Sequence, residues 1–288
     1  MPLDELLDAV GRVALEIRDG LSAHRGTETG QENPSGERQL AADVWADERV
    51  RARLLDVPGV VGYASEERST ADVHGEDADG YHVAVDPLDG SSNLATNNPL
   101  GILFGAYDRP LPAAGRHLVA SGYVLFGPLT TMTVARDGTV SEYLLERDTN
   151  HTPGRLLEQG LQLPAEPTVF GIGGSAPEWQ KPLREYVRSL EGRLKQRYAG
   201  ALVADVNQVL GYGGMFAYPQ LRSRPDGKLR LLFEGNPVAH IIETAGGRSS
   251  NGEQSLLDVP AERLHQRVPV HVGNSELIEG LERALAES

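Results

Sequence analysis

The chain has 288 residues, 40% of them hydrophobic, with 41 acidic and 27 basic side chains and a net charge of −14. This length and apolar content suffice for one large domain or two, whereas the negative charge argues against a nucleic-acid partner, which would need a basic face. The absence of cysteine excludes disulfides, thiolate metal sites and cysteine nucleophiles, so any metal must be held by oxygen or imidazole ligands.

The N-terminal half is predicted to begin with two helices and to continue with strands. Apolar residues recur at three- and four-residue spacing from Leu3 to Leu21, which predicts an amphipathic helix. Residues 37–55 are predicted as a second helix, with Asp43 and Asp47 on one face. The strands are predicted over residues 60–64, 82–85, 101–107, 118–125, 131–135 and 140–145.

The stretch 150–167 contains prolines and shows little periodicity, so we place the domain junction there. The division at residue 163 gives an N-terminal domain, 1–163, and a C-terminal domain, 164–288. The second domain is predicted to contain strands over 168–172 and 229–233 and helices over 178–190, 202–210, 237–245 and 275–286.

The most informative motif is the stretch 82–93, in which a predicted buried strand ends at Asp86 and a second carboxylate, Asp89, follows three residues later. The proline between them lacks the N–H that a central strand needs, so both carboxylates can face one site. Three backbone N–H groups that can converge on an anion follow, those of Gly90, Ser91 and Ser92. Asp-Pro and Asp-Gly are also common turn dipeptides, but their combination favours metal-assisted phosphate chemistry.

Further carboxylates end other predicted strands. Glu66 and Glu67 follow the strand over 60–64, and one of them can bind a metal while the other handles a proton. Glu234 follows the apolar run 231–233, although it would also suit the N-terminus of the helix that follows. Such a set supplies the oxygen ligands that Mg²⁺ prefers, and metals of this kind can activate water against a phosphate ester.

These residues resemble the signature of the class I fructose-1,6-bisphosphatase family, within the wider group of metal-dependent sugar and inositol phosphatases. The resemblance continues in order along nearly the whole chain, through residues 64–67, 97–107, 122–123, 197–200, 212–214, 227–234, 243–247 and 265–267. It implies a layered α-β-α-β-α fold, with two sheets sandwiched by helices, and a magnesium-dependent phosphoric monoester hydrolase. The implied reaction is hydrolysis of the 1-phosphate of fructose 1,6-bisphosphate.

The resemblance also implies roles for individual residues. Metal would be bound by Glu66, Asp86, Asp89 and Glu234 and by the backbone carbonyl of Leu88. Asp47 and Glu67 would position and deprotonate the attacking water, while the role of Asp43 stays open. The substrate would be bound by Gly90, Ser91, Ser92, Tyr198, Gly200, Leu202, Tyr218, Lys228 and Arg230, and by Arg197 reaching in from a neighbouring subunit.

The cofactor implied by the resemblance is Mg²⁺, two or three ions per site, with Mn²⁺ or Zn²⁺ as substitutes. The expected partners are a sugar bisphosphate and further copies of the chain, with a tetramer favoured over a dimer. The sequence departs from the family pattern at Gly173 and Ala176, where an asparagine and a tyrosine usually bind the 6-phosphate. It also lacks the family's N-terminal AMP-binding segment, and Gly80 replaces a lysine, so we expect weak control by AMP.

Several alternatives remain open at this point. The substrate could be sedoheptulose 1,7-bisphosphate, or both sugars, and a non-catalytic phosphate- or nucleotide-binding regulator is the alternative from another class. The glycine-rich stretch 171–176 matches a loose dinucleotide-binding pattern, but no acid-ended strand follows at the required distance. With no apolar run long enough to cross a bilayer and no signal peptide, we expect a cytoplasmic protein without a membrane partner. Its acidity fits either a high-salt host or a GC-rich genome.

Overall fold

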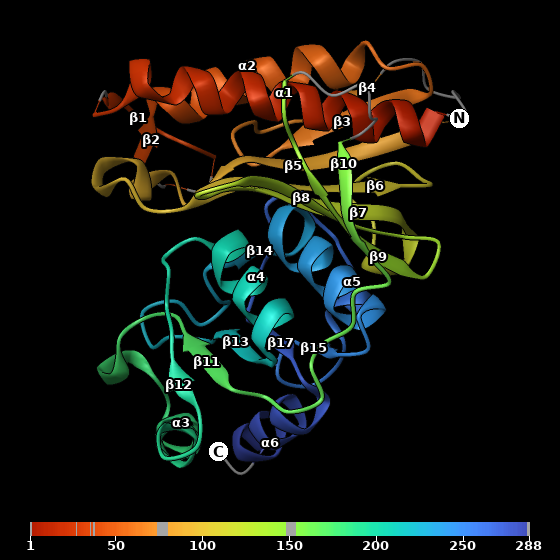
Figure 1. The fold of residues 1–288 in the computed structure, drawn as a ribbon. Helices are drawn as coiled ribbons and strands as arrows, with labels where there is room; N and C mark the ends of the chain where they lie inside the picture. The colour runs from red at the N-terminus through yellow and green to blue at the C-terminus, as the bar shows by residue number, and fades with distance from the viewer. Residues whose placement is uncertain are drawn as a thin grey trace.

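Helices and sheets alternate in five layers in the computed structural model, which describes residues 2–26, 28–34, 36, 38–73, 80–147 and 154–286 (Figure 1). Helices α1 (Pro2–His24) and α2 (Ala41–Leu55) cover an eight-stranded sheet. Helices α4 (Leu202–Tyr212) and α5 (Asn236–Thr244) separate it from a five-stranded sheet, whose far face carries α3 (Lys181–Glu191) and α6 (Ser275–Ala286). The predicted layered α-β-α-β-α fold is therefore confirmed.

The eight-stranded sheet has the order β10-β9-β8-β7-β6-β5-β3-β4. Its strands are β3 (Val60–Ser65), β4 (Asp72–Val73), β5 (Tyr81–Asp89), β6 (Leu100–Tyr107), β7 (Leu118–Phe126), β8 (Thr130–Arg136), β9 (Thr139–Leu144) and β10 (Arg155–Gln159). Only β3 and β5 pair in parallel among these described strands; all other pairs are antiparallel. The carboxyl ends of β3 and β5 consequently lie side by side at the same end of the sheet.

The five-stranded sheet has the order β12-β11-β13-β17-β15. Its strands are β11 (Val169–Ile172), β12 (Lys195–Gln196), β13 (Gly214–Tyr218), β15 (Arg248–Ser250) and β17 (Val270–Gly273). Two small antiparallel pairs complete the described strands, β1 (Glu28–Glu32) with β2 (Arg38–Leu40) and β14 (Leu229–Arg230) with β16 (Arg267–Val268).

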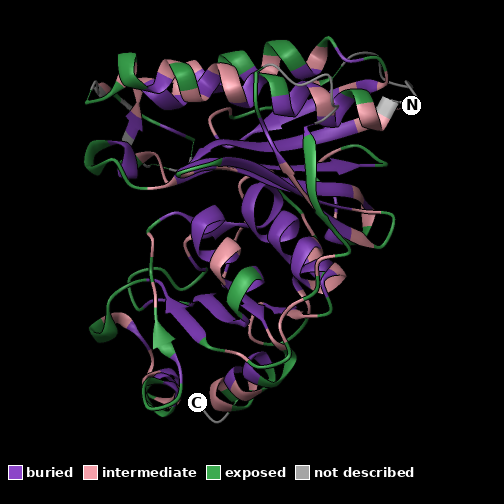
Figure 2. Ribbon diagram, viewed as in Figure 1, coloured by how far each residue is buried: buried purple, intermediate pink, exposed green. Residues whose placement is uncertain are grey.

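The core explains why this arrangement is stable. Every residue of β6 is buried, because α4 and α5 cover one face of the large sheet and α1 and α2 the other (Figure 2). A strand buried on both faces reads as a continuous apolar run, as residues 100–107 do. A separate apolar cluster lies between the small sheet and helices α3 and α6. In the described ranges, no helix is both long and apolar enough to span a membrane.

The sequence predicted most of these elements but not all. The structure confirms the predicted helices as α1 to α6, but the helix predicted over residues 37–55 begins only at Ala41, because Arg38–Leu40 pairs with β1 as strand β2. The strands that were not predicted are β1, β2, β4, β10, β12, β13, β15, β16 and β17. The strand predicted over 229–233 is wrong beyond Arg230, because Leu231–Gly235 forms a π-helical turn that leads directly into α5. The proposed division at residue 163 falls in the connection between β10 and β11, and it stays a prediction.

Candidate active site

Three carboxylates from different elements meet where β3 and β5 end. In the parallel register Ser65 lies beside Val85, so the next residues, Glu66 and Asp86, emerge together. Glu234 reaches the same point from the π-helical turn. One carboxylate oxygen from each of Glu66, Asp86 and Glu234 lies within 4.8 Å of the others. Strand pairing and the turn therefore build an acidic cluster from residues that are far apart in the chain.

Backbone N–H groups fix the orientation of these carboxylates. Asp86 Oδ1 accepts a hydrogen bond of 3.0 Å from the Leu88 N–H, across an irregularity in the β5–β6 pairing. Glu234 Oε2 accepts one of 2.6 Å from the Arg230 N–H. Asp89 Oδ2 accepts one of 2.8 Å from Val203 in the first turn of α4. Asp89 belongs to the N-terminal half and α4 to the C-terminal half, so this bond ties the two halves together at the site.

The cluster is short of positive charge. Burial raises the pKa of Asp86 well above its ordinary value, and the neighbouring carboxylates raise it further. Burial, followed by the effect of Glu66, raises the pKa of Glu234 to about 7. Arg230, with only 3% of its side chain exposed, lies 2.9 Å from Glu66 and 3.7 Å from Glu234. Arg230, together with the Lys228 ammonium that acts on Asp89 and Glu234, cannot balance this many buried carboxylates, so the site favours binding of additional cations.

Two further acids lie beside the cluster. The side chain of Gln39 donates a hydrogen bond to Glu67, and burial, with a smaller effect of Asp43, raises the pKa of Glu67 to about 7. Asp43 stands in the first turn of α2, where it accepts a 2.7 Å hydrogen bond from the Leu40 N–H, and burial raises its pKa to about 6. Both carboxylates can therefore exchange protons near neutral pH.

Asp47 is held by side chains outside the acidic cluster, and its predicted catalytic role stays a prediction. Its carboxylate accepts hydrogen bonds from the Tyr63 hydroxyl at 2.9 Å and from the Arg68 Nε at 2.6 Å, and it does not line the cavity that holds the cluster. Asp43, one helical turn earlier on α2, does line that cavity. The helical spacing put both acids on one face of α2, but only the one in the first turn reaches the site.

A tight turn follows Asp89. Gly90 has φ +74°, and a Cβ atom at this position would lie 2.4 Å from the Cβ of Ala201, so glycine is required on both counts. The Asn93 N–H closes the turn by bonding to the Gly90 carbonyl at 2.8 Å. Ser91 and Ser92 stand between them at the cavity wall. The turn thus brings backbone and hydroxyl donors next to the carboxylates.

The opposite wall is a loop from the C-terminal half, residues 198–202. Asp205 accepts a 2.7 Å hydrogen bond from the Ala199 N–H, and the Asn93 amide donates to the Ala199 carbonyl at 2.9 Å. The loop is therefore held by Asp205 of α4 on one side and by Asn93, in the turn after Asp89, on the other. Asp205 was not predicted from the sequence, although an acid in the first turn of a helix that follows a glycine is a recognisable signal.

Aromatic and cationic side chains complete this wall. Tyr198 is 51% exposed, and the Lys228 ammonium lies 5.3 Å from the centre of the Tyr218 ring. A Cβ atom at Gly173 would lie 2.3 Å from that ring, so the Tyr218 ring occupies the space that a side chain at residue 173 would need. Packing against Tyr218 thus explains one of the glycines in the stretch 171–176.

Arg197 points elsewhere within its own chain. Its guanidinium lies over the Tyr212 ring at 5.1 Å and donates to Gln208 at 3.2 Å. It does not line the cavity that Tyr198 and Tyr218 line. In its own chain the Arg197 side chain is thus engaged outside the cavity, and its predicted contribution to a neighbouring subunit stays a prediction.

One cavity of about 240 Å³ brings the predicted residues together. Among its walls are all the predicted site residues except Asp47 and Arg197, namely Glu66, Glu67, Asp86, Leu88, Asp89, Gly90, Ser91, Ser92, Tyr198, Gly200, Leu202, Tyr218, Lys228, Arg230 and Glu234. It also includes Asn33, Asp43 and Asp205, which were not assigned. The walls carry both buried acids and the side chains of Tyr198, Tyr218 and Lys228, which suits a molecule with anionic groups held through cations.

The donor set fits a hard divalent cation. Carboxylate oxygens and the neighbouring Leu88 carbonyl are ligands of the class that Mg²⁺ and Mn²⁺ bind, and the chain has no cysteine that would favour a softer metal. The raised carboxylate pKa values point the same way, because a bound cation would stabilise the ionised forms.

Comparison with known proteins agrees with this geometry. The family model described as the N-terminal domain of fructose-1-6-bisphosphatase matches residues 3–152, and that of the C-terminal domain matches residues 163–286. The class 1 fructose-1,6-bisphosphatase of Natronomonas pharaonis is 55% identical over 283 residues, covering 98% of each chain. That of Halobacterium salinarum is 52% identical over 286 residues, covering 99% of this chain and 98% of the relative.

Solved structures show the same similarity. The holo form of Leishmania major fructose-1,6-bisphosphatase superposes with a TM-score of 0.91 at 27% identity, covering 99% of this chain and 94% of that one. The apo form of the same enzyme gives a TM-score of 0.85, with 99% and 93% covered. The similarity therefore extends over both sheets and all five layers.

Proposed function

The chain belongs to the class 1 fructose-1,6-bisphosphatase family, and from this we propose that it hydrolyses the 1-phosphate of D-fructose 1,6-bisphosphate to fructose 6-phosphate and phosphate. The reaction is a step of gluconeogenesis. The observation that carries the proposal is the meeting of Glu66, Asp86 and Glu234 in a cavity that also holds the turn at Gly90. A metal-dependent phosphatase needs such a cluster to hold the metal, and it needs hydrogen-bond donors beside the cluster to hold the phosphate.

We propose that the acidic cluster binds two or three Mg²⁺ ions, and that Mn²⁺ or Zn²⁺ can replace them. The assigned ligands are Glu66, Asp86, Asp89, Glu234 and the Leu88 carbonyl. When bound, the metal supplies positive charge that acidifies a water and stabilises the leaving alkoxide. Arg230, already paired with two of these carboxylates, is placed to contact the reacting phosphate beside them.

We assign proton transfer to Glu67, assisted by Asp43. A water gives a proton to the Glu67 carboxylate as its oxygen attacks phosphorus, and the bond from phosphorus to the sugar oxygen breaks. A pKa near 7 suits a base that must take up this proton and release it again. Asp43 replaces Asp47 in this assignment because Asp43 lines the cavity, whereas Arg68 and Tyr63 hold the Asp47 carboxylate.

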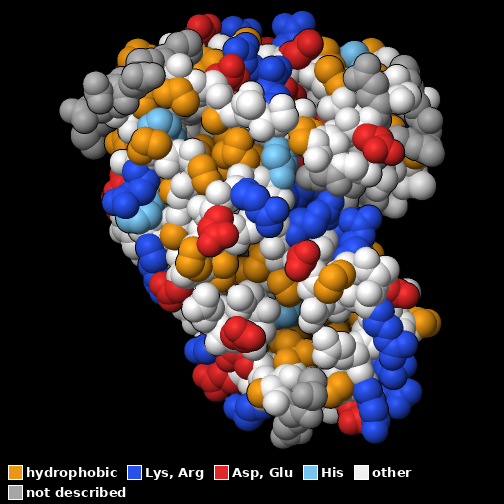
Figure 3. Space-filling model, turned by 180° about the vertical axis from the view of Figure 1, so that it is seen from behind, with side chains coloured by type: hydrophobic (Ala, Val, Ile, Leu, Met, Phe, Trp, Pro, Cys, Tyr) orange, Lys and Arg blue, Asp and Glu red, His pale blue; other side chains and the backbone are white. Residues whose placement is uncertain are grey.

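The remaining wall is assigned to the sugar and its second phosphate. The N–H groups of Gly90, Ser91 and Ser92 would face the reacting phosphate, and Gly200 and Leu202 would line the sugar. Tyr198 and Tyr218 would hold the 6-phosphate, and Lys228, whose charge acts on Asp89 and Glu234, would face the sugar and the reacting phosphate. Although the chain is acidic overall, Lys and Arg side chains gather across the middle of the face seen in Figure 3, where the two halves meet. Such a local positive field attracts a bisphosphate.

We further propose a homo-oligomer, a tetramer or a dimer, in which Arg197 reaches the 6-phosphate site of the neighbouring subunit. The support is its position over Tyr212, away from its own cavity, together with the loss of donors at Gly173 and Ala176. A cytoplasmic location is proposed on the sequence alone.

Phosphate release from a panel of sugar bisphosphates tests the function. Fructose 1,6-bisphosphate should give the highest kcat/KM with Mg²⁺, and chelation by EDTA should abolish release reversibly. A higher kcat/KM for sedoheptulose 1,7-bisphosphate would instead identify that sugar as the main substrate. Tight binding of a bisphosphate without any release, at saturating Mg²⁺ and Mn²⁺, would instead support the non-catalytic regulator, which the family membership does not favour.

A further inference from the structure

The stretch 265–267 is part of the sequence resemblance, but it does not line the catalytic cavity. It runs beside the segment 228–234, which supplies several walls of that cavity. The Gln266 carbonyl accepts a 2.8 Å hydrogen bond from the Leu231 N–H, and β16 pairs with β14 directly beside this bond. The stretch thus supports the backbone on which residues of the site stand.

His265 extends from this stretch to the N-terminal half. Its Nε2 lies 2.7 Å from the carbonyl oxygen of Arg68. Because a carbonyl oxygen can only accept, Nε2 carries the proton and donates it to this bond. Burial lowers the pKa of His265, so the ring is neutral at physiological pH. The ring also packs against Phe233, with 5.3 Å between the ring centres, directly before Glu234 in the chain.

The bond from His265 reaches the backbone directly after Glu67. Strand β3 ends at Ser65, and the Glu66 N–H still bonds to the Val85 carbonyl at 3.1 Å, so the sheet holds Glu66. Glu67 lies beyond this pairing, and its N–H turns back to the Ser65 hydroxyl at 3.2 Å. The backbone after Glu67 is therefore tied to the C-terminal half through the imidazole of His265.

We infer that His265 is a positioning residue for the proposed reaction, because its bond to the Arg68 carbonyl fixes the backbone that carries Glu67. This role rests on the catalytic assignment of Glu67 in the proposed function. Glu67 lines the cavity, and a base can take a proton only from a water within about 2.6–3.2 Å. A misplacement of about 1 Å can cost about 10²-fold in rate. Since His265 does not line the cavity, it affects kcat through Glu67 and not by contact with the substrate.

Two substitutions separate the N–H donor from the imidazole ring. His265→Leu removes the donor, whereas His265→Gln keeps an N–H at a similar distance from the backbone. The leucine variant should lower kcat at least about tenfold, while KM and the Mg²⁺ concentration for half-maximal activity stay within about twofold of wild type. The glutamine variant should restore most of kcat. If the leucine variant does not fold, His265→Asn, which is polar but too short to reach the Arg68 carbonyl, should give the same loss.

A double-mutant cycle measures whether His265 acts through Glu67. In a Glu67→Gln background, His265→Leu should lower kcat no further, because the group that it positions is already lost. Two independent effects would multiply. The assay uses the sugar bisphosphate that the wild type hydrolyses with the highest kcat/KM.

A spectroscopic measurement follows the position of Glu67 without any substrate. The Gln39 side chain donates a hydrogen bond to the Glu67 carboxylate, so the ¹⁵N–¹H signals of the Gln39 amide report where that carboxylate lies. Loss of these signals in Gln39→Leu identifies them. His265→Leu should move them, and His265→Gln should leave them at the wild-type position.

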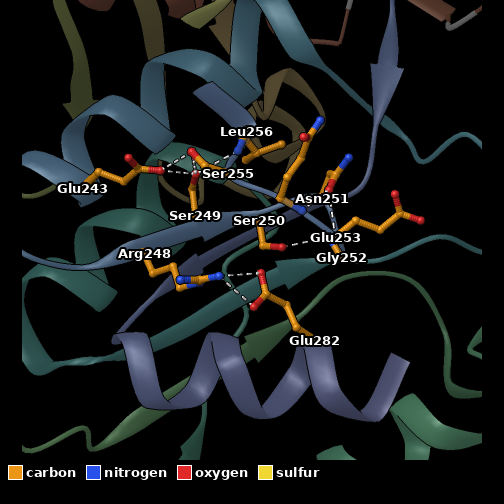
Figure 4. A network of polar contacts seen from close by, with 11 residues as sticks. Glu243, Arg248, Ser249, Ser250, Asn251, Gly252, Glu253, Ser255, Leu256 and Glu282 are labelled. Carbon is orange, nitrogen blue, oxygen red and sulfur yellow. Dashed lines mark hydrogen bonds and ion pairs between the residues drawn. The ribbon is translucent and has the colours of Figure 1, made fainter. Parts of the chain in front are cut away.

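The polar network in Figure 4 supplies a control for a purely structural effect. There the hydroxyls of Ser249 and Ser255 donate to Glu243 Oε1, and none of these three residues lines the catalytic cavity. Ser255→Ala should lower the urea concentration at the midpoint of unfolding, because it removes a hydrogen bond. It should change neither kcat nor the Gln39 signals.

Four results would overturn the role of His265. They are wild-type kcat in folded His265→Leu, equal losses in the leucine and glutamine variants, multiplying effects in the cycle, and Gln39 signals that His265→Leu leaves in place. If the wild type releases phosphate from no sugar bisphosphate, the proposed function fails instead, and the Gln39 signals alone decide whether His265 positions Glu67.

Discussion

The two ends of the catalytic cavity are built on different physical principles. At the acidic end Asp86, Asp89 and Glu234 are buried and fixed by backbone N–H groups, and their pKa values are raised. At the other end Tyr198 is half exposed, and the Tyr218 ring packs where a side chain at Gly173 would lie. The carboxylates of Asp86, Asp89 and Glu234 at the acidic end are all held by backbone N–H groups of the same chain, whereas the proposed sugar-phosphate end has fewer fixed contacts. We therefore expect substitutions at the first to affect kcat and at the second to affect KM.

The largest effect is expected at the acidic end. Asp86→Asn and Glu234→Gln should each reduce phosphate release to background, because each removes a charge that holds the cation. Circular dichroism should show an intact fold, since both carboxylates repel their neighbours in the metal-free protein. Asp137→Asn, at a side chain that is 84% exposed, is the control and should have wild-type activity. Near-normal turnover in Asp86→Asn or Glu234→Gln would show that the substituted residue is not a required metal ligand.

Glu67→Gln should lower kcat by about 10²–10⁴-fold while the Mg²⁺ concentration needed for half-maximal activity changes little, because we assign this side chain to proton transfer. Activity is measured as Mg²⁺ is titrated against wild type and variant in parallel. If a high Mg²⁺ concentration restores full activity, Glu67 is a metal ligand and the assignment is wrong.

A smaller and more discriminating contrast comes from the two acids of α2. Asp43→Asn should lower kcat about tenfold or more with little change in stability, since Asp43 lines the cavity. Asp47→Asn should mainly lower the free energy of unfolding, by about 1–3 kcal/mol, because it weakens the contacts to Tyr63 and Arg68. Kinetics and urea denaturation of both variants give the comparison. The reverse pattern would restore Asp47 as the catalytic acid of α2.

At the sugar-phosphate end, Arg197→Ala should raise KM for the bisphosphate about tenfold and leave kcat nearly unchanged, because it removes one charged hydrogen bond to a phosphate that does not react. Mixing this variant with Asp86→Asn tests whether the arginine acts across subunits, since a hybrid can assemble one site with both parts intact. Recovery of the wild-type KM in the mixture is expected. A fully active monomer, or no recovery despite proven subunit exchange, would count against the proposal.

Most of the fold follows from local sequence. The apolar stripe from Leu3 to Leu21 correctly predicted α1, and the continuous apolar run within residues 100–107 correctly predicted β6. The structure departs from expectation where long-range contacts decide. Residues 231–233 have an apolar pattern typical of a strand, but they form a π-helical turn that presents Glu234 to the cluster. The strand β10 was missed because all its residues are exposed, so it shows no apolar alternation.

The site could be predicted to a similar degree. Its prediction also failed where long-range contacts decide the structure. The motif at residues 86–92 is contiguous, so its turn and its acids could be assigned from the sequence. The choice between Asp43 and Asp47 could not, because both lie on one helical face and only the position of α2 against β3 decides which one reaches the cavity. The position of Asp205 in the first turn of α4 was visible in the sequence, but its bond to the Ala199 N–H, which holds the loop at the cavity wall, depends on how that loop folds.

Direct measurement of cation binding tests the central claim, that the acidic end of the cavity holds the metal. Mn²⁺ is titrated into the protein without substrate, and the free ion is followed by electron paramagnetic resonance. Wild type and Asp137→Asn should bind Mn²⁺ saturably, and added Mg²⁺ should displace it. The double variant Asp86→Asn/Glu234→Gln should bind none in the same concentration range. Wild-type Mn²⁺ binding by the folded double variant would contradict the account.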